Sequence, residues 1–198
     1  GCGFPAVITH GFARTATHID KAFINTNINE LLTKTLGVTT YCINDADAIG
    51  IVEIAAGEGR GLEGTIVLVT LDTGLGTALF VNGKLVPNTE LGHILLENGL
   101  EAETMMRQLL LSDCSPRSAK WAEMWNLYLA RIEQLFWPDL FILSGSAGHR
   151  LPEFIDLLAF KTPVVAAAMH DQACLVGAAI YAGMEAEHLK RLSQKAAI

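Results

Sequence analysis

The sequence predicts an α/β fold with a mixed sheet and flanking helices. Residues 65–71 form a nearly continuous apolar run, which is typical of a strand that is buried on both faces. From residue 65 onward, the pattern predicts three successive strands, and alternating helices and strands follow them. Successive strands pair as hairpins, whereas strands separated by helices pair in parallel, so a mixed sheet accounts for both halves of the pattern.

Before this region, the sequence predicts short strands at residues 5–9 and 39–43, the second of them rich in β-branched and aromatic residues. Apolar residues then recur at helical spacing over residues 45–57. Asn44 or Asp45 would cap this helix, because either side chain can accept a hydrogen bond from its free N–H groups.

The remaining elements follow in order. Asn82-Gly83 separates two short apolar segments, which predicts a hairpin with a type I′ turn. The other expected elements are strands at 77–81, 84–86, 140–143 and 163–167, and helices at about 100–111, 118–136, 152–160 and 171–183. By analogy, this order is that of a ribonuclease-H-like domain. The helix at 45–57 marks the expected boundary, with residues 1–46 as part of a smaller N-terminal lobe and residues 47–198 as the ribonuclease-H-like lobe.

An aromatic stripe runs along the predicted helix at 118–136. Trp121, Trp125 and Tyr128 recur at helical spacing together with Leu129 and Ile132. A stripe of this kind could stack on a ligand, but it more commonly forms core or a dimer interface, and we expect one of these two here.

Composition excludes several classes of protein. The 198 residues are 51% hydrophobic and carry a net charge of −7, from 21 acidic and 14 basic residues, with no basic stripe for nucleic acid. The sequence contains neither an apolar run long enough to span a membrane nor a secretion signal. Cys2, Cys42, Cys114 and Cys174 lie far apart in the sequence, which suggests neither a zinc site nor a disulfide framework and favours the reducing cytoplasm.

Three segments carry polar groups of interest. Asp45 follows an apolar strand, a glycine-rich turn (Asp72-Thr73-Gly74-Leu75-Gly76) follows another, and Glu90 and His93 lie beyond it. These are the parts that phosphoryl transfer to a sugar hydroxyl needs: a base, backbone N–H groups for phosphate, and groups that orient the sugar. The alternatives are simpler. Asp45 could only cap a helix, the glycines could form an ordinary turn, and Glu90 could be a surface acid beside a packed histidine.

Taken together, several segments resemble the ROK family of sugar kinases, and within it the polyphosphate/ATP-dependent glucokinases. The resemblance extends over essentially the whole chain, and the order and spacing of the segments make it specific. The segments that carry it are Gly1-Cys2-Gly3-Phe4-Pro5, residues 15–21, Asn44-Asp45-Ala46-Asp47, residues 72–76, residues 86–93, residues 137–142 and residues 171–179.

The resemblance implies an actin-like ATPase fold and a set of roles. Asp45 would be the catalytic base. Asn44, Glu90 and His93 would bind sugar hydroxyls, and Glu103 would bind them too unless it is an exposed helix residue. His18 stands where the family has a sugar-binding asparagine. Family members use Mg²⁺ with ATP or polyphosphate as donor and usually form homodimers, and no structural zinc is expected because the zinc-binding cysteine cluster is absent.

The phosphate-binding residues implied by the resemblance are Asp72, Thr73, Gly74, Gly76 and Gly145, although Gly145 could instead belong to a loop that caps the next helix. Asp72 departs from the family, which has glycine at this position. A carboxylate about 4 Å from a phosphate charge costs on the order of 4 kcal/mol at an effective dielectric constant near 20. Either Mg²⁺ lies between the two charges or the side chain turns away, and the sequence leaves both open.

Two functions are therefore compatible with the sequence. The first is a glucokinase-like enzyme that transfers a phosphoryl group from polyphosphate or ATP to glucose or a related hexose. The second is a non-catalytic sugar-binding or scaffold protein of the same family, which the carboxylate of Asp72 would favour. The family's first phosphate loop, a DxGGT-type segment, does not occur in the sequence. We therefore expect the donor site of this truncated chain to lack one wall, which favours a chain that is inactive by itself.

Overall fold

The computed structural model describes residues 1–112 and 114–196, and these residues form two compact units. Unit 1 contains Gly1–Val52 and Gln172–Ile198, and unit 2 contains Glu53–Asp171. Helix α2 (Asp45–Ala56) runs across the boundary in the sequence. The units differ from the lobes expected from the sequence, because the C-terminal helix joins the N-terminal residues through its contacts with their strands.

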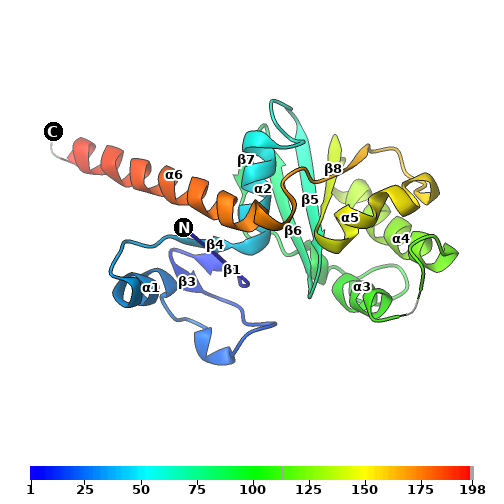
Figure 1. The fold of residues 1–198 in the computed structure, drawn as a ribbon, viewed down its shortest axis with the longest axis horizontal. Helices are drawn as coiled ribbons and strands as arrows, with labels where there is room; N and C mark the ends of the chain where they lie inside the picture. Colours follow the sequence, from blue (N-terminus) through cyan, green and yellow to red (C-terminus); the bar gives the residue numbers. More distant parts are fainter. Residues whose placement is uncertain (113, 197–198) are drawn as a thin grey trace. The chain divides into compact units, whose positions relative to one another are not determined.

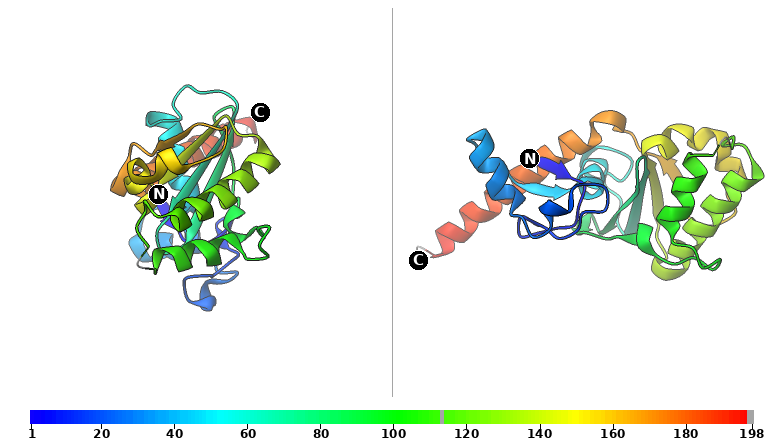
Figure 2. Two further views of the ribbon diagram at one scale, coloured as in Figure 1. Left: turned by 90° about the vertical axis from the view of Figure 1, so that its right-hand side faces the viewer. Right: turned by 90° about the horizontal axis from the view of Figure 1, so that it is seen from below.

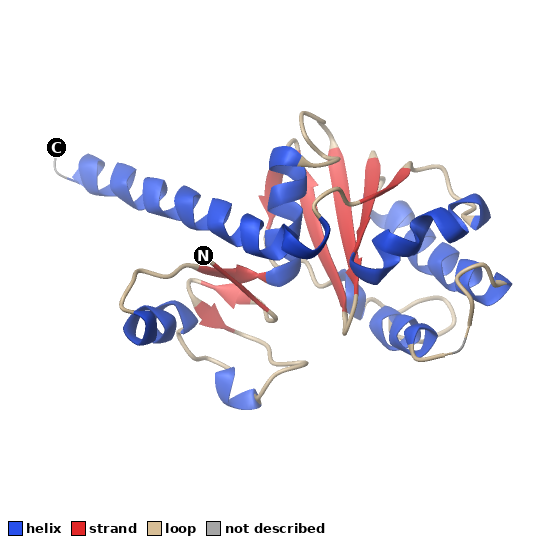
Figure 3. Ribbon diagram, in the orientation of Figure 1, coloured by secondary structure: helices blue, strands red, loops and turns tan. Residues whose placement is uncertain are grey.

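Unit 1 is built on short strands. Strand β1 (Cys2–Phe4) pairs in parallel with β4 (Cys42–Asn44), and β2 (Ile8–Thr9) pairs antiparallel with β3 (Phe12–Ala13). The single strand expected at residues 5–9 is therefore wrong in its bounds (Figure 3). A 3₁₀ turn, η1 (Lys21–Phe23), follows β3.

Helix α1 (Ile28–Leu36), which the sequence analysis did not predict, has clear end signals. The side chain of Asn27 accepts a hydrogen bond from the Glu30 N–H at its start. Gly37 ends it in the left-handed conformation, with φ of 71°, where glycine carries no Cβ penalty. Only Ile28 of this helix is fully buried.

The C-terminal helix α6 (Ala173–Ala196) contacts β1 and β4 within unit 1 (Figure 1). Its backbone approaches α2 closely, since a Cβ placed on Gly177 would lie 1.7 Å from the carbonyl oxygen of Ala48. Only glycine fits at this contact. The helix expected at residues 171–183 is present, although it extends further than predicted.

Unit 2 contains a five-stranded mixed sheet in the order β7-β6-β5-β8-β9. Strands β5, β6 and β7 pair antiparallel, whereas β5, β8 and β9 pair in parallel, which confirms the predicted mixed sheet. Asn82 and Gly83 have φ values of 50° and 71°, as the predicted type I′ turn requires. The strands are β5 (Thr65–Leu71), β6 (Leu75–Val81), β7 (Lys84–Val86), β8 (Leu140–Ser144) and β9 (Val164–Ala166).

Three helices share a hydrophobic core with one face of this sheet: α3 (Ala102–Leu110), α4 (Ala119–Phe136) and α5 (Gly145–Phe154) (Figure 2). Trp121, Trp125 and Tyr128 of α4 are at most 1% exposed, which confirms that the aromatic stripe belongs to the core. Helix α5 begins at Gly145, so the helix expected at residues 152–160 is wrong in its bounds. Three 3₁₀ turns complete the fold, namely η2 (Leu91–His93), η3 (Ile155–Leu157) and η4 (His170–Gln172).

Within the described ranges, 1–112 and 114–196, no helix combines the length and the apolar character that crossing a bilayer requires.

Candidate active site

The predicted base, Asp45, is the first residue of α2 and follows β4 directly. Its side chain is half-buried, and Oδ1 accepts a hydrogen bond from the Ala46 N–H at 2.8 Å. Burial raises the pKa of the Asp45 carboxyl, whereas the N–H groups of residues 45 and 46 and the charge of His18 oppose this rise. A raised pKa brings a carboxylate closer to the range in which it can accept a proton at neutral pH.

Asn44, expected to bind sugar, is mostly committed to the backbone. Its Oδ1 accepts a hydrogen bond from the Asp47 N–H at 3.1 Å, so Asn44, rather than Asp45, caps α2. Its Nδ2 donates to the carbonyl oxygen of Ala6 at 3.2 Å. With the residue 9% exposed, one amide hydrogen is left for a ligand.

His18, the third candidate in unit 1, is exposed and lies close enough to Asp45 for its charge to lower the pKa of that carboxyl. The structure therefore brings His18 and Asp45 together within unit 1.

In unit 2, three carboxylates surround the imidazole of His93. Its Nδ1 lies 2.6 Å from Glu101 Oε1 and 3.7 Å from Glu103 Oε2, and its Nε2 lies 3.6 Å from Glu90 Oε2. Although burial opposes it, the pKa of His93 is raised by the hydrogen bond to Glu101 and by the three negative charges. The structure therefore brings Glu90, His93 and Glu103 together, and it adds Glu101, which the sequence analysis missed.

The members of this cluster differ in how far their side chains are exposed to solvent. The side chains of His93 and Glu90 are 40% and 41% exposed, so both can reach a ligand. Glu103 is 7% exposed, so the alternative that it is an exposed helix residue is wrong. The position of Glu101 could have identified it from the sequence, since it lies two residues before Glu103, beside the predicted start of α3.

Strand β6 holds the segment that carries Glu90. The Thr77 hydroxyl donates to the carbonyl oxygen of Thr89 and accepts a hydrogen bond from the Leu91 N–H. A Cβ on Gly92 would lie 2.4 Å from the carbonyl oxygen of Leu75, so glycine is needed for this close approach.

Asp72 lies in the turn between β5 and β6 and reaches the start of α5. Its Oδ1 accepts a hydrogen bond from the Ser146 N–H at 2.9 Å, and the Ser146 hydroxyl donates to the carbonyl oxygen of Leu71. A Cβ on Gly145 would lie 2.5 Å from Asp72 Oδ2. The carboxylate thus occupies the N-terminus of a helix, where backbone N–H groups favour an anion.

The rest of the glycine-rich segment is divided between turn and strand. Thr73 and Gly74 lie in the turn, where the Gly74 carbonyl oxygen accepts a hydrogen bond from the Asp72 N–H. Gly76 belongs to β6 and pairs with Thr70, so it lies outside the turn.

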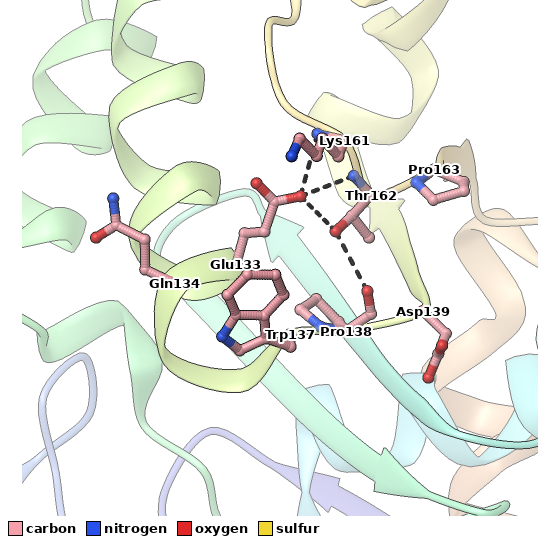
Figure 4. Close-up of a pocket in the computed structure, with 8 residues that line it drawn as sticks. All are labelled: Glu133, Gln134, Trp137, Pro138, Asp139, Lys161, Thr162 and Pro163. Atoms are coloured by element: carbon pink, nitrogen blue, oxygen red, sulfur yellow. Dashed lines mark hydrogen bonds between the residues drawn. The ribbon is translucent and has the colours of Figure 1, made fainter.

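A cavity of about 440 Å³ lies at the other end of β8 (Figure 4). Pro138 and Asp139, which line it, precede this strand, whereas Ser146 follows it. Glu133 accepts hydrogen bonds there from the Lys161 N–H and from the N–H and hydroxyl of Thr162, and so ties α4 to the segment before β9. None of the predicted site residues lines this cavity.

Among residues 1–112 and 114–196, no group of three or more His, Cys, Asp or Glu side chains is arranged to hold a metal ion. Mg²⁺ commonly binds through one or two carboxylates and the phosphates of a substrate, so this observation concerns preformed protein sites alone.

Matches to a family model, to a curated protein and to a solved structure all point to sugar kinases. The model of the ROK family matches residues 1–117. The polyphosphate glucokinase of Mycobacterium tuberculosis is 39% identical over 189 residues, which cover 95% of this chain and 71% of that protein. The crystal structure of inorganic polyphosphate/ATP-glucomannokinase from Arthrobacter sp. strain KM superimposes with a TM-score of 0.82 at 38% identity, over 92% of this chain and 72% of the other.

More distant structures share the fold. A ROK family glucokinase from Streptomyces griseus, solved with glucose and AMPPNP, gives a TM-score of 0.73 at 21% identity, over 90% of this chain and 79% of the other. These neighbours confirm the predicted fold class, that of actin-like sugar kinases. The match of the family model to residues 1–117 and the 39% identity over 95% of the chain show that this chain belongs to the ROK family.

Proposed function

We propose that this chain is a glucokinase-like phosphotransferase that transfers a phosphoryl group from polyphosphate or ATP to glucose or a related hexose. The observation that carries the proposal is the 39% identity to a polyphosphate glucokinase over 95% of the chain. The glucomannokinase, 38% identical, supports the same donors and widens the acceptor to related hexoses.

In this proposal, Asp45 accepts the proton of the attacking sugar hydroxyl. Its half-buried position and raised pKa support the role, because a base works best when its pKa approaches the working pH. His18, whose charge acts on Asp45, and the remaining amide hydrogen of Asn44 would help to orient the sugar.

Glu90 and His93 would hydrogen-bond sugar hydroxyls, since both side chains are partly exposed. Glu103 is more buried, and its charge adds to the hydrogen bond and charge of Glu101 in raising the pKa of His93, which favours the protonated imidazole. A protonated His93 donates hydrogen bonds, whereas Glu90 accepts them, so the pair can recognise a hydroxyl as acceptor and as donor.

Thr73, Gly74 and Gly145 would lie near the phosphoryl donor, with Gly76 supporting the turn from β6. Mg²⁺ would be held by the donor's own phosphate oxygens and would neutralise charge as the phosphoryl group moves.

The test is a coupled assay of glucose phosphorylation with polyphosphate and with ATP, repeated with mannose. Asp45→Asn should lower kcat by about 10²- to 10⁴-fold. Glu30→Gln, which removes an exposed acid of the same unit, is the matched control and should leave the rate unchanged. Activity in Asp45→Asn equal to that of the unaltered chain would refute the assignment of the base.

A second function, a non-catalytic sugar-binding or scaffold protein, is favoured by one observation. The Asp72 carboxylate occupies the start of α5, where a donor phosphate would otherwise meet free N–H groups. Titration calorimetry separates the cases, because glucose binding without turnover indicates a sugar-binding protein.

We further propose a homodimer that works in the cytoplasm. Exposed apolar side chains along α6 support self-association, and four free thiols suit a reducing compartment. Light scattering on the purified chain tests the oligomeric state.

A further inference from the structure

Three of the four cysteines gather around β1 and β4 in unit 1, although they lie far apart in the sequence. Cys2 and Cys42 are direct partners in the parallel pairing of these strands. Cys174, on α6, lies over Gly3, where a Cβ would meet its sulfur at 2.3 Å. The topology therefore creates a thiol cluster that the spacing of the cysteines conceals.

The side chains of Cys2 and Cys42 lie on the same face of the strand pair, because partners in adjacent strands point the same way. Both contact one apolar cluster of unit 1. Neighbouring strands lie about 4.8 Å apart, within the range of about 4.4–6.8 Å that disulfides span between Cα atoms. Cys174 packs over Gly3, the next residue along β1, and therefore lies on the opposite face.

The two paired thiols differ in access and in acidity. Cys42 is 1% exposed, whereas Cys2 is half-buried and can meet a small reagent. The hydrogen bond from the Cys42 thiol lowers the pKa of Cys2 to about 6. The same contact, together with burial, raises the pKa of Cys42. The lower pKa makes Cys2 the more nucleophilic thiol of the pair, with Cys42 as its protonated partner.

We propose that Cys2 and Cys42 form a modification site that low-molecular-weight disulfides oxidise to an internal disulfide between β1 and β4. The Cys2 thiolate attacks one sulfur of the reagent, whose S–S bond breaks and releases one thiolate. The Cys42 sulfur then attacks the Cys2 sulfur, and the second reagent thiolate leaves and takes the Cys42 proton. Two protein thiols are oxidised, and one small disulfide is reduced to two thiols.

The second step is favoured by the first. Once Cys2 is in a mixed disulfide, it no longer carries the negative charge that raises the pKa of Cys42. Cys42 then ionises more readily beside the sulfur that it attacks. This inference is independent of the proposed catalytic activity, because it depends only on the pairing of β1 with β4.

The test exposes the 198-residue chain to oxidised glutathione, counts free thiols with a chromogenic disulfide and maps the peptides by mass spectrometry. We expect the loss of two thiols, a Cys2–Cys42 linked peptide and no retained glutathione. From pH 7 to pH 5, the rate of the first step should fall about tenfold, as the thiolate fraction of Cys2 does.

Variants distinguish the steps. Cys42→Ser should trap glutathione on Cys2, and Cys2→Ser should leave Cys42 unmodified. Cys114→Ser, in unit 2, is the matched control and should form the same link as the unaltered chain. A Cys2–Cys174 link, a stable glutathione adduct on Cys2 of the unaltered chain, or retention of all four thiols would each overturn the proposal. Because the mapping uses the unaltered chain, the result does not depend on the folding of any variant.

Discussion

Substituting Asp72 removes the carboxylate from the start of α5. We expect Asp72→Gly to bind the phosphoryl donor more tightly, because the N–H of Ser146 then becomes free to meet a phosphate oxygen. Asp72→Asn, which keeps an oxygen at the same place, separates the charge from the hydrogen bond.

The magnitude follows from the geometry. The carboxylate lies 2.9 Å from the Ser146 nitrogen, so a phosphate held by the same N–H groups would lie about 4 Å from it, where like charges repel by about 4 kcal/mol at an effective dielectric constant near 20. Asp72 is exposed, and solvent weakens this repulsion. We therefore expect a gain of about 1.4 kcal/mol, or about tenfold in Kd.

The variant also has a cost in stability. Asp72 supplies a cap to α5 from another part of the chain, and loss of a cap typically lowers the free energy of unfolding by about 1 kcal/mol. Asp72→Asn should retain most of this contribution.

The assay is titration calorimetry with tripolyphosphate and with Mg²⁺-AMPPNP, which measures binding whether or not the chain is active. Glu153→Gln, an exposed acid near the other end of α5, is the control for the change in net charge. Weaker donor binding by both Asp72 variants would refute the reasoning and would assign the carboxylate to Mg²⁺ instead. Unchanged binding would show that the donor does not approach this helix.

Three further changes test other parts of unit 2. Glu101→Gln should lower the pKa of His93. A raised histidine pKa stabilises the fold below about pH 6.5, and this contribution disappears as the pH rises through the folded pKa. The free energy of unfolding of the variant should therefore fall at pH 5 and change little at pH 9. Tyr128→Phe should leave stability unchanged or raise it by about 1 kcal/mol in thermal unfolding, because the buried hydroxyl has no hydrogen-bond partner among the described residues. Gly92→Ala should raise KM for glucose more than it lowers the melting temperature, since its Cβ would press against the Leu75 carbonyl oxygen and displace Glu90.

Local sequence patterns predicted much of the fold. The apolar run of β5 and the Asn82-Gly83 turn depend on neighbours in the sequence, and both occur where expected. Helix α1 was missed although Asn27 and Gly37 mark its ends and Ile28, Leu31 and Leu32 recur at helical spacing, so the sequence contained the signals for this helix.

The first strand shows the limit of such patterns. The apolar segment at 5–9 resembles a strand more than Cys2–Phe4 does, yet Cys2–Phe4 pairs with β4. The choice depends on a partner about forty residues away, which no local pattern contains.

The candidate site also contains residues that the sequence identified and contacts that only the fold reveals. Glu90 and His93 could be paired from the sequence because they lie three residues apart, whereas Glu103 was added only through the family resemblance. The contact between Asp72 and Ser146 joins residues 74 apart, and only the parallel pairing of β5 with β8 brings them together. The sequence could therefore identify Asp72 as unusual without revealing what it touches.

The tight packing of α6 on α2 has a practical consequence for anyone who shortens or extends the protein. Gly177 lies against the turn of α2 that begins at Asp45, so the last helix braces a carboxylate encoded far upstream. A deletion that removes the first turns of α6 would then uncover the start of α2, the helix that carries the proposed base.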